Sequence, residues 1–154
     1  MTELVELYKK LEQYSHFEED EENCERFLDT VDQIVLKNDP SAIPELLKYC
    51  EKNYNYDVIE ESLNNVLLYL INKHGSYYFI ISLNKLLVKN LCFCEEITSI
   101  IFNSKRTYDD FRKNMHLADK ESLLKLFKIM EVESPHHREL IRELRAEIET
   151  SPKE

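Results

Sequence analysis

The chain has 154 residues, 43% of them hydrophobic, which is enough apolar material for the core of one domain. Thirty acidic and twenty basic side chains give a formal net charge of −10, which disfavours direct binding to nucleic acid or to anionic membrane surfaces. One glycine and four prolines leave little turn material, so the composition favours an all-α fold.

The hydrophobic periodicity predicts about nine short helices in chain order. They cover residues 2–14, 18–38, 42–52, 57–75, 77–89, 92–102, 107–117, 119–130 and 135–148. Links of two to five residues favour antiparallel neighbours, so we expect an irregular HEAT-like array without a strict repeat. The array is predicted to form a single domain over residues 1–149, followed by a frayed tail at 150–154.

The helix predicted at 57–75 is the most clearly delimited of these. Asp57 follows a polar loop and occupies an expected N-cap position, and Gly75, the only glycine, is an expected left-handed C-cap. Between them, apolar residues from Val58 to Ile71 recur at three- and four-residue steps and predict a buried stripe. The remaining positions carry carboxylates and amides, so this helix is expected to present a polar strip outward.

The N-terminus begins with Glu3 and Glu6 and lacks the apolar segment of a signal peptide. The longest apolar runs are also too short to span a bilayer. We therefore expect a cytoplasmic protein with reduced thiols at its four cysteines.

Catalytic and metal-binding signatures are weak. The single glycine rules out a Gly-rich phosphate loop and a Gly-x-Ser-x-Gly elbow. Cys92 and Cys94 are one residue too close for the usual zinc knuckle, and burial of these thiols is the favoured interpretation.

The histidines give no stronger signal for a site. Glu133 and His136 have di-iron spacing, but Pro135 begins a helix between them and no second copy exists. His136 and His137 are expected at the surface. We therefore expect no enzyme activity and no cofactor, although a small enzyme or metal-binding bundle is a rival reading with inward-pointing ligands.

Acidic and tyrosine side chains favour a protein-binding surface, because tyrosine is enriched at interface hot spots and carboxylates attract cationic partners. A solvated helix face is the competing interpretation for each carboxylate taken singly. The candidate contact residues are Glu18, Glu19, Asp20, Glu21 and Glu22, then Tyr54, Tyr56, Asp57, Glu60, Glu61 and Asn64, with Asp109 and Asp110 as a lesser cluster.

Several segments resemble an all-helical family of immunity proteins from bacterial polymorphic-toxin and contact-dependent growth inhibition systems. The resemblance covers about residues 42–146, and this chain lacks the tryptophan that the family often carries before its Asn-Ser step. The matching segments are Asp57-Val58-Ile59-Glu60-Glu61-Ser62-Leu63, Ile101-Phe102-Asn103-Ser104, Phe111 and Leu123-Leu124-Lys125-Leu126-Phe127.

The resemblance implies a protein that binds a cognate toxin in the bacterial cytosol and blocks its active site. The charge of −10 favours a toxin with a basic cleft, such as a nuclease, over a pore-forming or peptidase toxin. The alternative function is a helical-repeat adaptor or scaffold for a host protein, which predicts an exposed apolar groove instead of an acidic surface.

Overall fold

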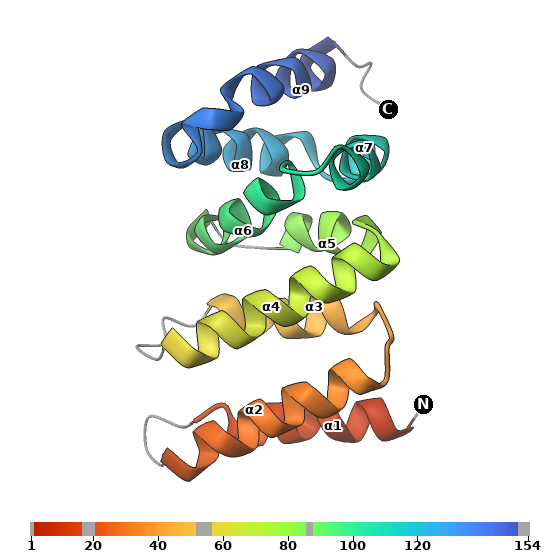
Figure 1. Ribbon diagram of the computed structural model, residues 1–154, viewed down its shortest axis with the longest axis vertical. Helices are drawn as coiled ribbons and strands as arrows, with labels where there is room; N and C mark the ends of the chain where they lie inside the picture. Colours follow the sequence, from red (N-terminus) through yellow and green to blue (C-terminus); the bar gives the residue numbers. More distant parts are fainter. Residues whose placement is uncertain (1, 17–20, 52–56, 86–87, 151–154) are drawn as a thin grey trace. The chain divides into compact units, whose positions relative to one another are not determined.

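A computed structural model describes residues 2–16, 21–51, 57–85 and 88–150, and the side chains of residues 3–16, 22–50, 59–84 and 94–150. Over this part of the chain the protein is all-α and contains no strand (Figure 1). The all-α prediction is therefore confirmed, whereas the HEAT-like antiparallel arrangement stays a prediction.

The described part of the chain contains α-helices and single 3₁₀ turns. The α-helices are α1 (Thr2–Tyr14), α2 (Glu21–Leu36), α3 (Ala42–Leu47), α4 (Asp57–His74), α5 (Tyr77–Ser82), α6 (Val88–Ile101), α7 (Lys105–Asn114), α8 (Lys120–Glu133) and α9 (Arg138–Thr150). The 3₁₀ turns are η1 (Lys48–Glu51), η2 (Leu83–Lys85), η3 (Met115–Leu117) and η4 (Pro135–His137).

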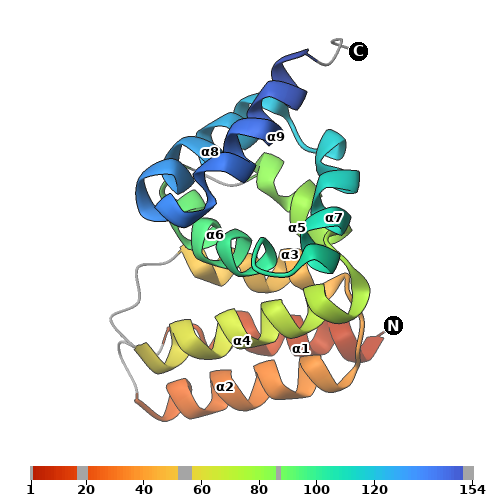
Figure 2. The same ribbon diagram turned by 45° about the horizontal axis from the view of Figure 1, so that its top comes forward.

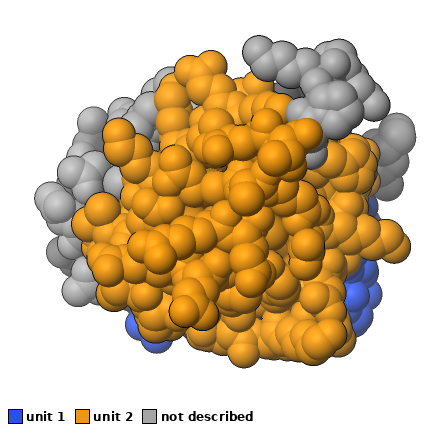
Figure 3. Space-filling model, turned by 90° about the horizontal axis from the view of Figure 1, so that it is seen from above, with its two compact units in different colours: residues 1–74 blue, residues 75–154 orange. Residues whose placement is uncertain are grey.

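The chain divides into two compact units, residues 1–74 and residues 75–154, which are coloured separately in Figure 3. The first unit contains α1 to α4 and the second contains α5 to α9. The single-domain assignment stays a prediction, and each unit is described by itself.

In the first unit, α2 packs against both α1 and α4, and α3 packs against α4. Figures 1 and 2 show α2 and α4 side by side and running in the same direction. Phe27, Val31 and Ile34 lie one turn apart on α2 and are fully buried. The ring of Tyr49 meets Phe27 edge-on at 5.4 Å between centroids. Each fully buried aliphatic or aromatic side chain stabilises the fold by about 1.5–3 kcal/mol.

Helix α4 keeps the predicted span almost to the residue. Among the described apolar positions of α4, Val66 and Leu68 are half-buried, whereas those buried at the expected three- and four-residue steps are Ile59, Leu63, Leu67, Leu70 and Ile71. Gly75 has a φ of 92°, which confirms the left-handed C-terminal position. Asp57 is the first residue of the helix; its predicted N-cap role stays a prediction, because the residue before it lies outside the described part of the chain.

In the second unit, α8 packs against α6 and α9, and α7 packs against α5 and α6. Phe102, Phe111 and Phe127 form the aromatic centre of this unit. The rings of Phe102 and Phe111 are 5.3 Å apart in an edge-on arrangement. Asp119 caps α8 by accepting a hydrogen bond from the Ser122 N–H at 3.2 Å.

The helix predicted at 77–89 is wrong in extent, because α5 ends at Ser82 and α6 already begins at Val88. The chain passes through the 3₁₀ turn η2, where Asn84 is fixed by two backbone groups of the link before α8. Its Oδ1 accepts from the Asp119 N–H at 2.6 Å, and its Nδ2 donates to the Leu117 carbonyl at 3.5 Å. These long-range bonds stabilise the 3₁₀ turn at which α5 ends.

At the start of α3, Ser41 makes no side-chain capping bond; its hydroxyl donates to the Asp39 carboxylate at 2.7 Å, and this bond lowers the pKa of Asp39. One further expectation is corrected. His136 is exposed as expected, but His137 retains only 6% of its surface and is buried. Its ring packs edge-on against Phe102, a contact between η4 and the turn after α6 that sequence spacing does not reveal.

Candidate interaction surface

Much of the predicted contact set falls outside the residues that the structure describes. For Glu21 and Asp57, the first residues of α2 and α4, the structure describes the backbone but not the side chain. The predicted contacts that lie wholly outside are Glu18, Glu19, Asp20, Tyr54 and Tyr56.

The described members of the first two groups differ in their surroundings. Glu60 and Glu61 are exposed near the start of α4 and have no ion-pair partner among the described residues. Glu22 is exposed but accepts a hydrogen bond from Arg26 at 3.3 Å. Asn64 is half-buried, and its Oδ1 is buried without a hydrogen-bond partner, so this oxygen is turned away from solvent.

Asp109 and Asp110 lie in the second unit and serve intramolecular roles. Asp109 is exposed and pairs with Lys105 at 3.2 Å, one helical turn away. The Asp110 carboxylate accepts the Ser76 N–H at 2.7 Å and thereby binds the N-terminus of α5. Asp110 therefore stabilises the fold in the manner of a capping residue, and neither aspartate offers an unpaired carboxylate.

A row of carboxylates on α2 is not among the contact residues predicted from the sequence. Glu25, Asp29 and Asp32 follow one another at four- and three-residue steps, which places them on one side of the helix. All three are exposed, opposite the buried side of α2 that Phe27 and Val31 mark. The spacing alone could have identified this group, which we call the α2 row.

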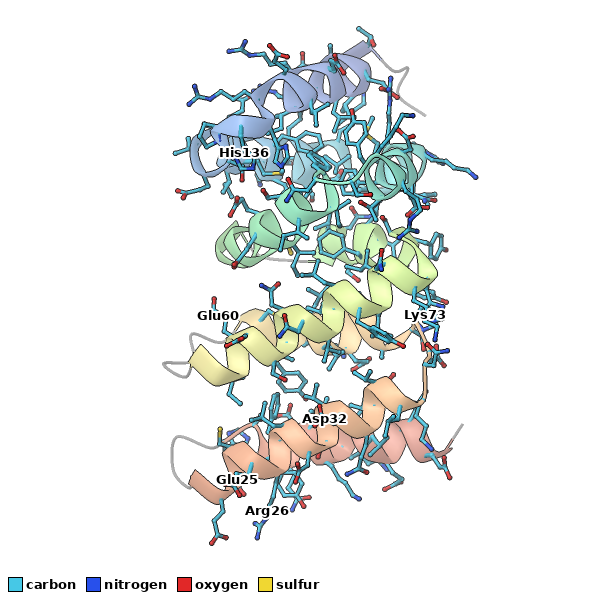
Figure 4. The ribbon with its side chains drawn as sticks, viewed as in Figure 1. Glu25, Arg26, Asp32, Glu60, Lys73 and His136 are labelled. Atoms are coloured by element: carbon cyan, nitrogen blue, oxygen red, sulfur yellow. The ribbon has the colours of Figure 1, made fainter. Side chains whose placement is uncertain are left out.

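The α2 row and the exposed carboxylates of Glu60 and Glu61, which we call the α4 pair, lie on two helices that pack against each other. Because α2 and α4 run in the same direction, Glu25 and Glu60 lie near the same end of the two helices (Figure 4). None of these five carboxylates has an ion-pair partner among the described residues. Unpaired charges retain their field for an external partner.

Charge is distributed very unevenly along the chain. Residues 1–74 contain 17 acidic and 7 basic side chains, whereas residues 75–154 contain 13 of each. The whole formal charge of −10 therefore belongs to the first unit, and the second unit is balanced. A basic partner is consequently attracted to residues 1–74 and not to the chain as a whole.

The cations of the first unit are mostly paired with carboxylates outside the α2 row and the α4 pair. These ion pairs are Lys9–Glu6, Arg26–Glu22, Lys37–Glu3 and Lys48–Glu45. Lys73, at the far end of α4 in Figure 4, donates to the Tyr69 hydroxyl at 3.4 Å and lies 5.7 Å from its ring centre. Pairing of this kind leaves the carboxylates near the start of α4 and along α2 unneutralised.

The described side chains include no group of three or more His, Cys, Asp or Glu residues that could hold a metal ion. Cys94 is almost fully buried, and burial raises the pKa of its thiol to about 12. The Cys92 side chain is outside the described residues. No described helix combines the length and the apolar character needed to cross a membrane.

Comparison with known proteins found no matching protein-family model, no matching curated protein and no matching solved structure.

Proposed function

We propose that this protein is an immunity protein that binds a cognate bacterial toxin through the α2 row and the α4 pair. The toxin is a basic protein, and a nuclease is the favoured class because its substrate-binding cleft must attract a polyanion. The immunity protein covers that cleft with carboxylates and takes part in no chemistry of its own. The two proteins meet in the cytosol.

One observation carries the proposal: the entire net negative charge is concentrated in residues 1–74, where five exposed carboxylates have no ion-pair partner among the described residues. Charge that served solubility alone would have no reason to be confined to one unit. Electrostatic complementarity increases association rates by about 10- to 1000-fold, which is valuable when a toxin must be neutralised on synthesis or entry.

The test is affinity capture from the native host followed by a growth assay. The protein is immobilised, captured proteins are identified by mass spectrometry, and each is expressed with and without the protein. We expect a captured basic protein that stops growth alone and is tolerated on co-expression. Captured proteins that are harmless on their own would contradict the proposal, and salt-independent capture through apolar contacts would favour the adaptor function instead.

Charge reversal locates the interface. Replacing Glu25, Asp29 and Asp32 by Lys should abolish growth protection and slow toxin association about tenfold or more, because attraction becomes repulsion. A matched control carries Glu96→Lys, Glu139→Lys and Glu143→Lys, which change the net charge equally at exposed positions of the second unit. Equal loss of protection in both variants would show that net charge, and not the α2 row, governs binding.

The α4 pair is tested separately, because its carboxylates lie on a different helix. Glu60→Lys with Glu61→Lys should weaken protection while the thermal unfolding midpoint stays nearly constant, since both side chains are exposed. Full protection by this variant, with loss of protection by the α2 variant, would confine the interface to α2.

A further inference from the structure

The link between α8 and α9 is fastened to α6 by two side chains. We call residues 134–137 the connector; it comprises Ser134 and the 3₁₀ turn η4. The Ser134 hydroxyl donates to the Glu95 carboxylate, and Nε2 of His137 bonds to the Ser99 carbonyl oxygen at 3.0 Å. These contacts join segments 38 and 39 residues apart in sequence and hold the start of α9 against α6.

The bond to Ser99 defines the protonation state of the ring. A carbonyl oxygen only accepts hydrogen bonds, so Nε2 of His137 must carry a proton. In the neutral ring Nδ1 is then unprotonated and is the atom that takes up a proton on acidification. No hydrogen bond to Nδ1 occurs among the described residues.

The surroundings of His137 oppose a second proton. The side chain is 6% exposed, with the Phe102 ring 5.8 Å away and the His136 ring 4.1 Å away, centroid to centroid. Burial is the main cause that lowers the pKa of His137, and the neighbouring His136 lowers it further. The bond to Ser99 acts in the opposite direction but is the smaller effect.

The ionisable groups on the elements packed around the connector offer His137 no compensating anion. The Glu95 carboxylate on α6 accepts from Ser134, and the Glu131 carboxylate on α8 pairs with Arg145 at 2.7 Å. Glu133 is exposed at the end of α8. Arg138 on α9 donates to the Glu131 carbonyl at 3.1 Å.

We propose that the connector is an acid-released latch, in which protonation of His137 at Nδ1 frees residues 134–137 and the adjoining α9 from α6. The neutral ring fits the buried position, whereas the imidazolium must reach water. The proton is the only ligand needed, and the latch operates independently of toxin binding.

The sign follows from linkage. A histidine with a lowered pKa in the closed state binds its proton more readily in the open state, so acid favours opening. Above about pH 6.5 both states are neutral at this residue and the latch is closed. Below that pH, uptake of one proton can increase the open population by up to about tenfold per pH unit.

Hydrogen exchange at α9 tests the latch in the intact protein. Exchange of the backbone amides of Ile141, Leu144 and Ile148 is followed between pH 7.5 and pH 5 and corrected for the intrinsic pH dependence of amide exchange. We expect the protection of these amides to fall about tenfold or more from pH 7 to pH 5, while the Val31 and Ile34 amides of α2 keep theirs.

His137→Gln is the matched variant, because the glutamine amide can donate to the Ser99 carbonyl but cannot titrate. Its α9 amides should show no pH response, whatever their level of protection, whereas His136→Gln should retain the response. A pH-independent wild type, or a pH response that survives in His137→Gln, would overturn the proposal. Should His137→Gln fail to fold, an NMR titration of the wild-type ring decides: a His137 pKa at or above about 6.5 would equally overturn it.

Discussion

At the scale of single residues, the hydroxyl of Tyr108 is an unusual feature of the second unit. Tyr108 is 8% exposed, its ring packs edge-on against Phe102 at 5.2 Å, and its oxygen is buried without a hydrogen-bond partner. Burial raises the pKa of this phenol. An unpaired buried hydroxyl costs about 1–3 kcal/mol, so its removal should stabilise the protein.

We therefore expect Tyr108→Phe to raise the free energy of unfolding by up to about 1–3 kcal/mol, measured by urea denaturation, because the ring contact is kept and the unpaired oxygen is lost. Tyr69→Phe is the control: its side chain is half-exposed, and the expected change is within about 0.5 kcal/mol. A clear loss of stability in Tyr108→Phe would mean that the hydroxyl has a hydrogen-bond partner in solution.

Neighbouring aspartates on α7 provide a second comparison. Asp110 accepts the Ser76 N–H at the start of α5, whereas Asp109 makes an exposed ion pair with Lys105. We expect Asp110→Ala to lower the free energy of unfolding by about 1–3 kcal/mol, since a charge-assisted hydrogen bond at a helix N-terminus is lost. Asp109→Ala should change it by less than about 1 kcal/mol. Equal effects in thermal or chemical denaturation would refute this distinction between adjacent carboxylates.

At the scale of elements, the ends of a helix can be predicted from the sequence where residues next to those ends determine them. Helix α4 was predicted almost to the residue because a polar loop precedes it and Gly75, with a positive φ, ends it. The end of α5 was not predictable, because residues 79–83 are mainly apolar and the break depends on Asn84 bonding to residues more than thirty positions away. Periodicity reports which residues are buried but not where a distant backbone group requires a turn.

The residues of the candidate surface also divide into those that local sequence predicts and those that depend on distant contacts. Exposure of Glu60 and Glu61 was predicted from their place outside the apolar stripe of α4. The spacing of the α2 row is sufficient to predict it, although the continuous acidic run before the row is the more conspicuous pattern in the sequence. Asp110 accepts a hydrogen bond from the Ser76 N–H, and His137 bonds to the Ser99 carbonyl. Both partners lie far away in sequence, so neither contact leaves a local pattern.

At the scale of the whole molecule, the division of charge predicts how association with a basic toxin responds to salt. The rate constant should fall markedly between about 0.02 M and about 0.15 M salt, where the screening length shortens toward about 8 Å. The slope of log rate against log salt should be shallower for the variant with all three α2 carboxylates replaced by Lys than for the control variant in the second unit. Stopped-flow or surface-plasmon kinetics would measure it, and identical slopes would argue against attraction through the α2 row.

The total charge of −10 does not by itself describe how copies of the protein interact with one another. In concentrated solution, long-range repulsion acts between residues 1–74 of different copies, whereas the balanced residues 75–154 present no net electrostatic barrier. The protein therefore behaves as a patchy colloid and not as a uniformly charged sphere. When copies meet in a concentrated sample or a growing crystal, residues 75–154 are where contacts between them should form first.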